Sequence, residues 1–235
     1  MTLFFIQDCD ETLQFLPKEE SKHAIRVLRL QTGDLMAISN GAGSIYTAKV
    51  VSPNPKKCEI EIFKTEKSED KSFKIHMAIA PTKLNDRFEW MLEKMTEIGV
   101  DEITPIICHH SERKVLKLER MNRIIISAVK QSWKAHKPIL NEPVKYSDFI
   151  KNNSFEQQFI AHCNGGCGQD THLQKLASPH KNICVLVGPE GDFSEAEVAL
   201  ATQNNWIKIG LGSARLRTET AGLVSCLTLN LINEV

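Results

Sequence analysis

The sequence predicts a two-domain chain of 235 residues, in which a small β-rich domain precedes an α/β domain with a parallel sheet. From residue 73 onward, short apolar runs alternate with segments of helical spacing, which is typical of a parallel α/β sheet. Before residue 64 the chain has short alternating strands and a hairpin signal at Asn40-Gly41. Residues 64–72 are charged and lack large apolar side chains, so we expect domains at 1–70 and 73–235.

The first domain is expected to be a small barrel with one helix. Strands are predicted at residues 3–6, 34–39, 44–51 and 58–63, the last because Ile60 and Ile62 alternate with glutamates. The helix is predicted at residues 21–30, where Ile25 and Leu28 have helical spacing and Gly33 follows.

The second domain is expected to contain about five strand–helix units. Strands are predicted at residues 75–80, 103–108, 159–163, 183–187 and 206–209, and helices at 84–98, 118–134 and 173–177. Ser194 and Glu197 have the spacing of a capping box, and Phe193 and Val198 have that of a hydrophobic staple. We expect Thr218 to cap a last helix that runs to about residue 230.

Two glycine-bearing loops follow the last two predicted strands. They contain Gly188 and Gly191 in the first loop and Gly210 and Gly212 in the second. Adjacent loops at the carboxyl ends of parallel strands form the crevice in which open α/β sheets bind ligands. Each glycine alone is also compatible with an ordinary turn. Both loops together carry charged residues as well, namely Glu190, Arg215, Arg217 and Glu219.

The motif GPEGDFSEAEV, followed by LGSARLRTETAG, resembles the paired signature of the RsmE family, the 16S ribosomal RNA uridine-N3 methyltransferases. This resemblance covers the whole chain. It implies a PUA-like N-terminal barrel and a SPOUT-type α/β domain, in which a trefoil knot holds S-adenosylmethionine. It also implies that the substrate is a uridine of small-subunit ribosomal RNA. Asp192 departs from the family, which commonly has a second glycine there.

The resemblance also implies which residues form the site. Backbone groups of the two loops are expected to hold the cofactor, at Leu186, Val187, Gly188, Pro189, Glu190, Gly191, Ile209, Gly210, Leu211, Gly212 and Leu216. Lys83 and Gln131 match positions where the family usually carries polar site residues. Lys130 and Lys134 stand where the family often has a glutamate and an arginine.

The predicted catalytic residues are Arg215, Arg217 and Glu219. N3 of neutral uracil carries a proton, so a methyl transfer to it requires a base or a cation that stabilises the anion. Glu219 could accept this proton, and the arginines could hold the uracil carbonyl oxygens or a phosphate. The alternatives remain open: Glu219 could be a first-turn carboxylate that the helix dipole stabilises, and the arginines could form ion pairs with Glu190 or Glu219.

The chain has 29 basic and 29 acidic residues, so its formal charge is zero, but basic residues concentrate at 109–137. This segment contains eight basic residues and only two acidic ones, Glu112 and Glu119, which is an excess of six positive charges. If residues 113–137 are mostly helical, they form a stripe for RNA phosphates, although a solvated helix face is the alternative. The predicted RNA-binding residues are Arg26, Arg29, Lys83, Arg113, Lys117, Arg120, Lys130, Gln131 and Lys134.

Other features of the sequence bear on the cellular compartment of the protein, on metal binding and on oligomerisation. No apolar run approaches the length of a membrane span, and no signal peptide is recognisable. The odd number of cysteines, seven, predicts reduced thiols in a cytoplasm. A zinc site at Cys163 and Cys167 with His162 and His172 matches no common spacing, so no metal is expected. The last helix is apolar on nearly every side, which predicts a homodimer.

Two further functions remain open from the sequence. A SPOUT enzyme acting on transfer RNA or on a ribose 2′-hydroxyl would share the same loops. A non-catalytic RNA-binding assembly factor would keep the fold without the chemistry.

Overall fold

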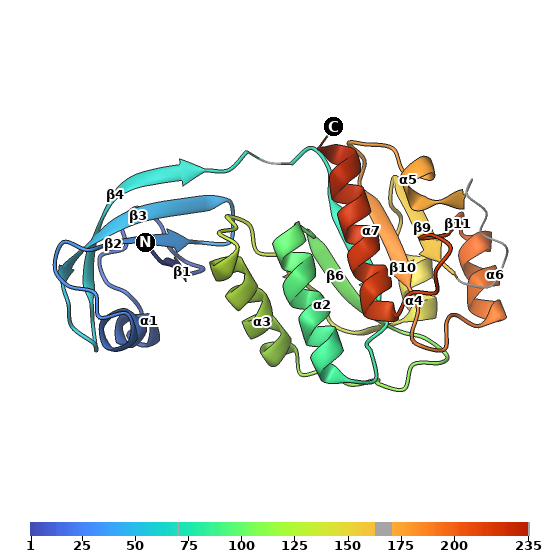
Figure 1. The fold of residues 1–235 in the computed structure, drawn as a ribbon, viewed down its shortest axis with the longest axis horizontal. Coiled ribbons are helices and arrows are strands. Elements are labelled where there is room, and N and C mark those ends of the chain that lie inside the picture. The colour runs from blue at the N-terminus through green and yellow to red at the C-terminus, as the bar shows by residue number, and fades with distance from the viewer. Residues whose placement is uncertain (70, 163–170, 235) are drawn as a thin grey trace. The chain divides into compact units, whose positions relative to one another are not determined.

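The computed structural model describes residues 1–69, 71–162 and 171–234 (Figure 1). The chain divides into two compact units. One consists of Met1–Asp70 with Ile126–Lys137, and the other of Lys71–Ile125 with Pro138–Val235. Residues 126–137 were expected to belong to the second domain. They cluster with the first unit because their backbone is hydrogen-bonded to its turn at residues 40–43, for example from Gly43 N–H to the Ala135 carbonyl at 3.0 Å.

The first unit contains a four-stranded sheet in the order β1-β2-β3-β4. Its elements are β1 (Leu3–Phe5), α1 (Lys18–Lys22), the π-helix η1 (His23–Val27), β2 (Leu35–Ser39), β3 (Ser44–Ser52) and β4 (Glu59–Lys67). The hairpin predicted at Asn40-Gly41 is confirmed, because β2 and β3 pair antiparallel on either side of it. The predicted helix at 21–30 begins and ends earlier, as α1 and η1. β4 extends to Lys67, into the charged residues 64–72 that were expected to separate the two domains.

Strand pairing in this unit forms an open sheet, and β1 and β4 do not pair with each other. Residues 14–16 continue the sheet beyond β4, since Ile60 N–H donates to the Gln14 carbonyl at 2.8 Å and Leu16 N–H to that of Cys58 at 2.9 Å. The apolar side chains gather in one core cluster that includes Phe4, Met36 and Ile38. Of the two isoleucines that alternate with glutamates in the last predicted strand, Ile60 lies in this core and Ile62 packs against it partly buried.

The second unit is built on a parallel sheet, as predicted. Among the described residues the order is β11-β9-β10-β5-β6-β7, with β8 also paired to β6. The strands are β5 (Ile75–Ile79), β6 (Glu102–Ile107), β7 (Ile139–Leu140), β8 (Val144–Lys145), β9 (Gln157–Ala161), β10 (Ile183–Val187) and β11 (Ile207–Ile209). Every pair in this sheet is parallel. The short strands β7 and β8 were not predicted.

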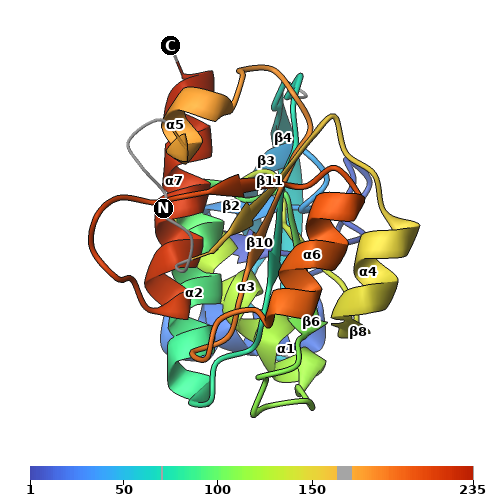
Figure 2. The ribbon, with the colours of Figure 1, turned by 90° about the vertical axis from the view of Figure 1, so that its right-hand side faces the viewer.

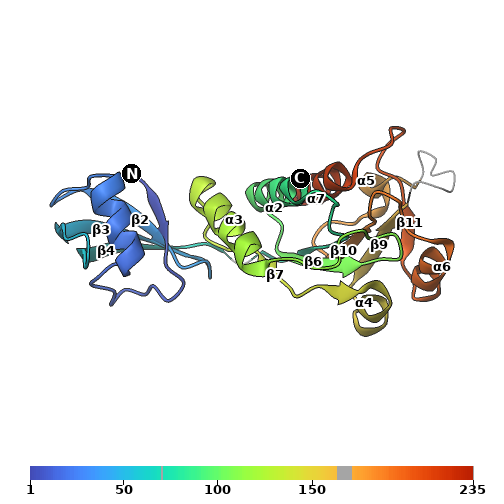
Figure 3. The ribbon, with the colours of Figure 1, turned by 90° about the horizontal axis from the view of Figure 1, so that it is seen from below.

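Helices cover both faces of this sheet. They are α2 (Asn85–Ile98), α4 (Tyr146–Asn152), α5 (Leu173–Leu176), α6 (Glu195–Gln203) and α7 (Thr218–Asn233). A further helix, α3 (Leu118–Gln131), is shared between the units, because its residues from Ile126 on belong to the first. α2 and α7 pack together on one face, and α4 and α6 on the other, as Figures 2 and 3 show from two directions. α4 was not predicted, although Tyr146, Phe149 and Ile150 are buried on its inner side.

The path of the chain brings the two glycine loops together. β10 lies between β9 and β5 in the middle of the sheet, whereas β11 lies at the edge, beside β9. After β11 the chain returns and α7 packs on β5 and β10. This return is close: a Cβ atom on Gly222 of α7 would stand 2.8 Å from Cδ1 of Ile79. Residues 210–217 therefore connect the edge of the sheet to its centre.

No helix in the described part of the chain is long and apolar enough to cross a membrane.

Candidate active site

The loop after β10 is fixed by the start of α6. The capping box predicted from Ser194 and Glu197 is present: Glu197 N–H donates to Ser194 Oγ at 3.3 Å, and Ser194 N–H donates to Glu197 Oε2 at 2.9 Å. A cap of this kind stabilises a helix by about 1 kcal/mol. Phe193 and Val198 are buried in one core cluster, as expected of a staple. The other Glu197 oxygen accepts from His109 N–H at 2.7 Å, which ties the loop after β6 to the same helix.

The loop after β5 is bound to both of its neighbours. Lys83 N–H donates to Glu190 Oε1 at 2.9 Å. Arg113 donates through Nη2 to the Lys83 carbonyl at 2.7 Å and through Nε to the Thr82 carbonyl at 3.2 Å. The Lys83 ammonium lies 2.9 Å from Glu112, whose hydrogen bond and charge raise the pKa of Lys83. Glu190, Arg113 and Lys83 thus make structural contacts, which sequence reasoning did not assign to them.

Asp192 has a left-handed backbone, with φ of 61°. Its Oδ1 accepts from Phe193 N–H at 2.8 Å, and its Oδ2 lies 3.0 Å from Nδ1 of His162. Nδ1 of His110 lies 3.0 Å from the Asp192 carbonyl oxygen. Aspartate tolerates left-handed backbone better than most residues, so it can replace a glycine here. These histidine contacts are tertiary, and the sequence offered no signal for them.

The first turn of α7 places a buried carboxylate next to the loop after β10. Thr218 is the first residue of the helix, and its hydroxyl donates to the Gly188 carbonyl at 3.0 Å. The prediction that Thr218 caps this helix is therefore wrong, since Arg217 occupies the N-cap position. Glu219 is 6% exposed. Its Oε1 lies 3.8 Å from Nε of Arg87 on α2, and its Oε2 is buried without a hydrogen-bond partner among the described residues.

The loop after β11 is held at its start and open beyond it. Gly210 N–H donates to the Thr171 carbonyl at 3.1 Å, and the Gly210 carbonyl accepts from Leu173 N–H at 3.2 Å. Residues 211–215 form no backbone hydrogen bond with any described residue. Gly212 has φ of 117°, and a Cβ atom there would meet nothing within 4 Å. This loop offers main-chain donors and acceptors to a ligand.

Arg215 and Arg217 are exposed and form no ion pair with the described residues. The alternative that they pair with Glu190 or Glu219 is not what the structure shows, because those carboxylates face Lys83 N–H and Arg87. Of the residues predicted to hold a cofactor, Leu186, Val187, Gly188, Pro189 and Ile209 are buried, whereas Glu190, Gly191, Gly210, Leu211, Gly212 and Leu216 are exposed or partly exposed. The buried ones can offer a ligand only main-chain groups.

The basic stripe predicted on residues 113–137 is interrupted. α3 covers only Leu118–Gln131, so Arg113, Lys117, Lys134 and Lys137 lie outside the helix. Nε of Arg120 lies 2.7 Å from Glu89, and Nζ of Lys130 lies 3.2 Å from Glu20 and 5.7 Å from the centre of the Phe4 ring.

The remaining predicted RNA-binding residues differ in exposure. Lys134 is partly buried, whereas Arg26, Arg29, Lys117 and Gln131 are exposed.

The described residues contain no group of three or more His, Cys, Asp or Glu side chains that could hold a metal. Cys163 and Cys167, weighed above as zinc ligands, lie outside the described residues. The thiols of Cys9, Cys58, Cys108 and Cys184 are buried and form no disulfide with a described residue. Burial raises the pKa of Cys9 to about 12.

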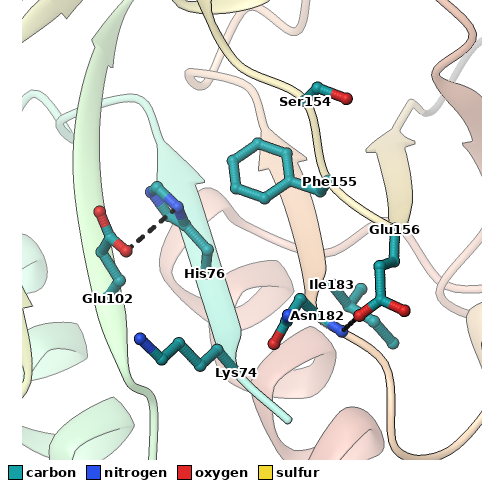
Figure 4. Close-up of a pocket in the computed structure, with 8 residues that line it drawn as sticks. All are labelled: Lys74, His76, Glu102, Ser154, Phe155, Glu156, Asn182 and Ile183. Atoms are coloured by element: carbon teal, nitrogen blue, oxygen red, sulfur yellow. Dashed lines mark hydrogen bonds and ion pairs between the residues drawn. The ribbon is translucent and has the colours of Figure 1, made fainter.

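A pocket of about 290 Å³ lies at the amino ends of the parallel strands, whereas the glycine loops lie at their carboxyl ends (Figure 4). It is lined by Lys74, His76, Glu102, Ser154, Phe155, Glu156, Asn182 and Ile183. His76 is buried, with Nε2 2.8 Å from Thr104 Oγ1 and Nδ1 3.7 Å from Glu102. This pocket is far along the strands from the glycine loops, so it is not the predicted cofactor site.

The geometry defines a class of protein: an α/β domain with two glycine-bearing loops at the carboxyl ends of parallel strands, joined to a small β unit. A family model for an RNA methyltransferase domain matches residues 69–230, and one for an RNA methyltransferase PUA domain matches residues 16–63. The first match covers more than half of the chain, which therefore belongs to the RNA methyltransferase domain family. The RNA methyltransferase and PUA-like assignments of the sequence analysis are confirmed.

Individual proteins are similar over nearly the whole length. A structure from Porphyromonas gingivalis, described as a probable rRNA-methyltransferase, has a TM-score of 0.91 and 38% identity, covering 100% of this chain and 99% of its own. The ribosomal RNA small subunit methyltransferase E of Neisseria gonorrhoeae, solved bound to S-adenosyl methionine, has a TM-score of 0.87 and 25% identity, covering 99% and 98%. The protein of the same name from Buchnera aphidicola subsp. Acyrthosiphon pisum is 28% identical, covering 97% and 91%.

Proposed function

We propose that this chain transfers a methyl group from S-adenosylmethionine to N3 of a specific uridine in the 16S ribosomal RNA of the small subunit. Family membership and the names of its relatives support the reaction class and the RNA. Glu219 is the structural observation that carries the proposal. Its carboxylate is buried beside the loop after β10, at the end of the loop after β11, and one of its oxygens has no partner among the described residues.

The residues present fit the cofactor. S-adenosylmethionine carries an adenine, ribose hydroxyls and an amino-acid group, which together require many hydrogen-bond donors and acceptors. The backbone of residues 211–215, which is not hydrogen-bonded to described residues, can supply these groups, and the open space at Gly212 leaves room for the ligand. Main-chain groups of residues 186–191 and 209–216 would hold the cofactor, which supplies an electrophilic methyl group on a sulfonium sulfur when bound.

Residues of the chain would accept the N3 proton and stabilise the negative charge that develops on the uracil. The carboxylate of Glu219 would accept the N3 proton of the uracil when the methyl group is transferred to N3. Arg87 holds that carboxylate in place from α2. Arg215 and Arg217 have no ion-pair partner among the described residues, so they remain available for the uracil carbonyl oxygens or an adjacent phosphate.

Further parts of the proposal concern the domains, the knot and the setting. Residues 1–70 and 73–235 act as RNA-holding and catalytic domains, with residues 126–137 contributed to the first. The return of the chain from β11 to the centre of the sheet supports a trefoil knot at the cofactor loops. The buried thiols of Cys9, Cys58, Cys108 and Cys184, which form no disulfide with a described residue, support a cytoplasmic protein.

We also propose a homodimer through α7. Leu227 and Leu231 are 46% and 53% exposed, and their spacing of four residues places them on one side of the helix. A second copy of the chain would cover them.

Mass spectrometry of ribosomal RNA nucleosides tests the function. Cells that lack the gene should lose N3-methyluridine from 16S ribosomal RNA, and the purified protein with S-adenosylmethionine should restore it. Loss of a 2′-O-methyl nucleoside, or of a methyl group on transfer RNA, would instead support the first alternative. An unchanged set of methylated nucleosides in both RNAs would support a non-catalytic assembly factor.

A further inference from the structure

Trp133 follows α3 with a left-handed backbone, φ 54°. An αL conformation just after a helix is normally supplied by glycine or asparagine, and for a bulky residue it is unfavourable. The other described non-glycine residues with positive φ are polar, namely Arg29, His180, Asp192 and Asn205. Despite its unfavourable backbone, the Trp133 side chain remains 43% exposed. Packing into a core therefore does not account for this residue.

The backbone around Trp133 is held firmly within the first unit. Lys134 N–H donates to the Val129 carbonyl at 3.1 Å, which closes the end of the helix. The Lys134 carbonyl accepts from Ser39 Oγ at 3.0 Å. Lys137 N–H donates to the Gly41 carbonyl at 2.9 Å. The exposed indole is therefore carried by a backbone that hydrogen bonds hold on both sides, so little backbone freedom remains to be lost on binding.

The charge near Trp133 is positive. Within residues 126–137, Lys134 and Lys137 follow Trp133 and no acidic residue is present, whereas Lys130 is already paired with Glu20. Proteins that bind single-stranded RNA combine exposed aromatic rings, on which bases stack, with cations that track the phosphates. We propose that Trp133 stacks on an unpaired base of the RNA substrate. This inference rests on the proposed function and adds to it a base-stacking residue in the first unit.

Substitution of Trp133 by glycine separates a binding role from a structural one. Glycine accepts the left-handed backbone, so Tm should stay the same or rise. Affinity for naked 16S ribosomal RNA should fall roughly tenfold, as expected for the loss of one base–aromatic stack. The salt dependence of binding should keep its slope, because no phosphate contact is lost. Trp133→Phe keeps a ring and should bind within about threefold of the wild type.

Trp90 provides a matched control. It is 47% exposed on α2, in the second unit, and Trp90→Ala should bind the RNA like the wild type. In a Trp90→Phe background, the emission of Trp133 should be quenched when RNA binds, since the remaining Trp206 is buried.

Several results would overturn the inference: wild-type affinity of Trp133→Gly, an equal loss in Trp90→Ala, or a Trp133→Phe variant as weak as Trp133→Gly. Failure of the proposed function would look different. In that case the wild-type protein itself would methylate no RNA, whereas failure of the Trp133 inference would leave methylation by the wild type intact.

Discussion

Nε of Arg87 lies 3.8 Å from Oε1 of Glu219, and this ion pair joins the first turn of α2 to the first turn of α7. The two residues are 132 positions apart in the chain, and the loops after β5 and β11 lead into their helices. The pair therefore holds a carboxylate at the carboxyl edge of the sheet, where the glycine loops lie.

Replacing Glu219 by glutamine tests its role as the proton acceptor. Glutamine keeps the size of the side chain and removes the basic oxygen, so turnover should fall about 10²-fold or more. S-adenosylmethionine affinity by calorimetry should stay within a few-fold of wild type. Arg217→Ala should give a similar loss through the substrate. Near-normal turnover in both variants would leave Glu219 as a helix-dipole carboxylate and Arg217 as a surface residue.

Gly212→Val should abolish S-adenosylmethionine binding. A Cβ atom at this position would touch no protein atom, so the cause would be twofold: valine strongly disfavours φ of 117°, and its side chain would occupy the open space left for the ligand. Calorimetry should detect binding to the wild type only. As a control, Gly33 has φ of 92° and an equally open Cβ position, but lies in the other unit. Gly33→Val should leave cofactor affinity unchanged, and normal binding by Gly212→Val would place the site elsewhere.

The exposed cations around the start of α3 are the best candidates for phosphate contacts. Lys114, Lys117 and Arg123 are exposed, whereas Lys130, Lys134 and Lys137 are partly buried. Changing the first three to alanine should weaken RNA binding and flatten its salt dependence by about one contact for each residue. The site of methylation should not change. A triple variant of the exposed Lys145, Lys151 and Lys208 loses the same charge and should keep the wild-type slope. Identical slopes for both triple variants would leave the α3 cations as a solvated face.

The homodimer proposed through α7 is tested by light scattering. The wild-type protein should have twice the monomer mass of 26.5 kDa at micromolar concentration. Leu227→Lys with Leu231→Lys should give the monomer mass without lowering Tm by more than a few degrees, because both side chains are already half exposed. A wild-type monomer, or a dimer unaffected by the two lysines, would rule out this interface.

His76 should make the protein less stable in mild acid. Burial lowers its pKa below the usual 6.5, and the charge of Glu102 opposes this only in part. The unfolded chain therefore binds a proton at His76 before the folded chain does, so stability is lost as the pH falls below about 6.5. The Tm of the wild type should drop more between pH 7 and pH 5.5 than that of His76→Gln. Equal slopes for His76→Gln and wild type would exclude this contribution.

The sequence predicted those features that depend on neighbours along the chain. The capping box needs only Ser194 and Glu197, three positions apart, and the parallel sheet follows from apolar runs alternating with helices. Left-handed backbone at Asp192 and the pairing of Arg87 with Glu219 depend on distant segments, which no local pattern encodes. α4 was missed because only Tyr146, Phe149 and Ile150 mark its short buried face. The predicted α3 was too long because the helical pattern continues past Gln131, although the backbone turns left-handed at Trp133.

The first unit is assembled from two segments that are far apart in the sequence and are therefore translated at different times. Ser39, Gly41 and Gly43 find hydrogen-bond partners among residues 134–137, which a ribosome makes only after the first 55 residues of the second unit, Lys71–Ile125. A nascent chain that has reached residue 70 therefore cannot complete this unit, and must wait for almost as many residues again to emerge. Domains usually fold one after another from the N-terminus, but here the N-terminal unit cannot finish folding until part of the second unit has been translated.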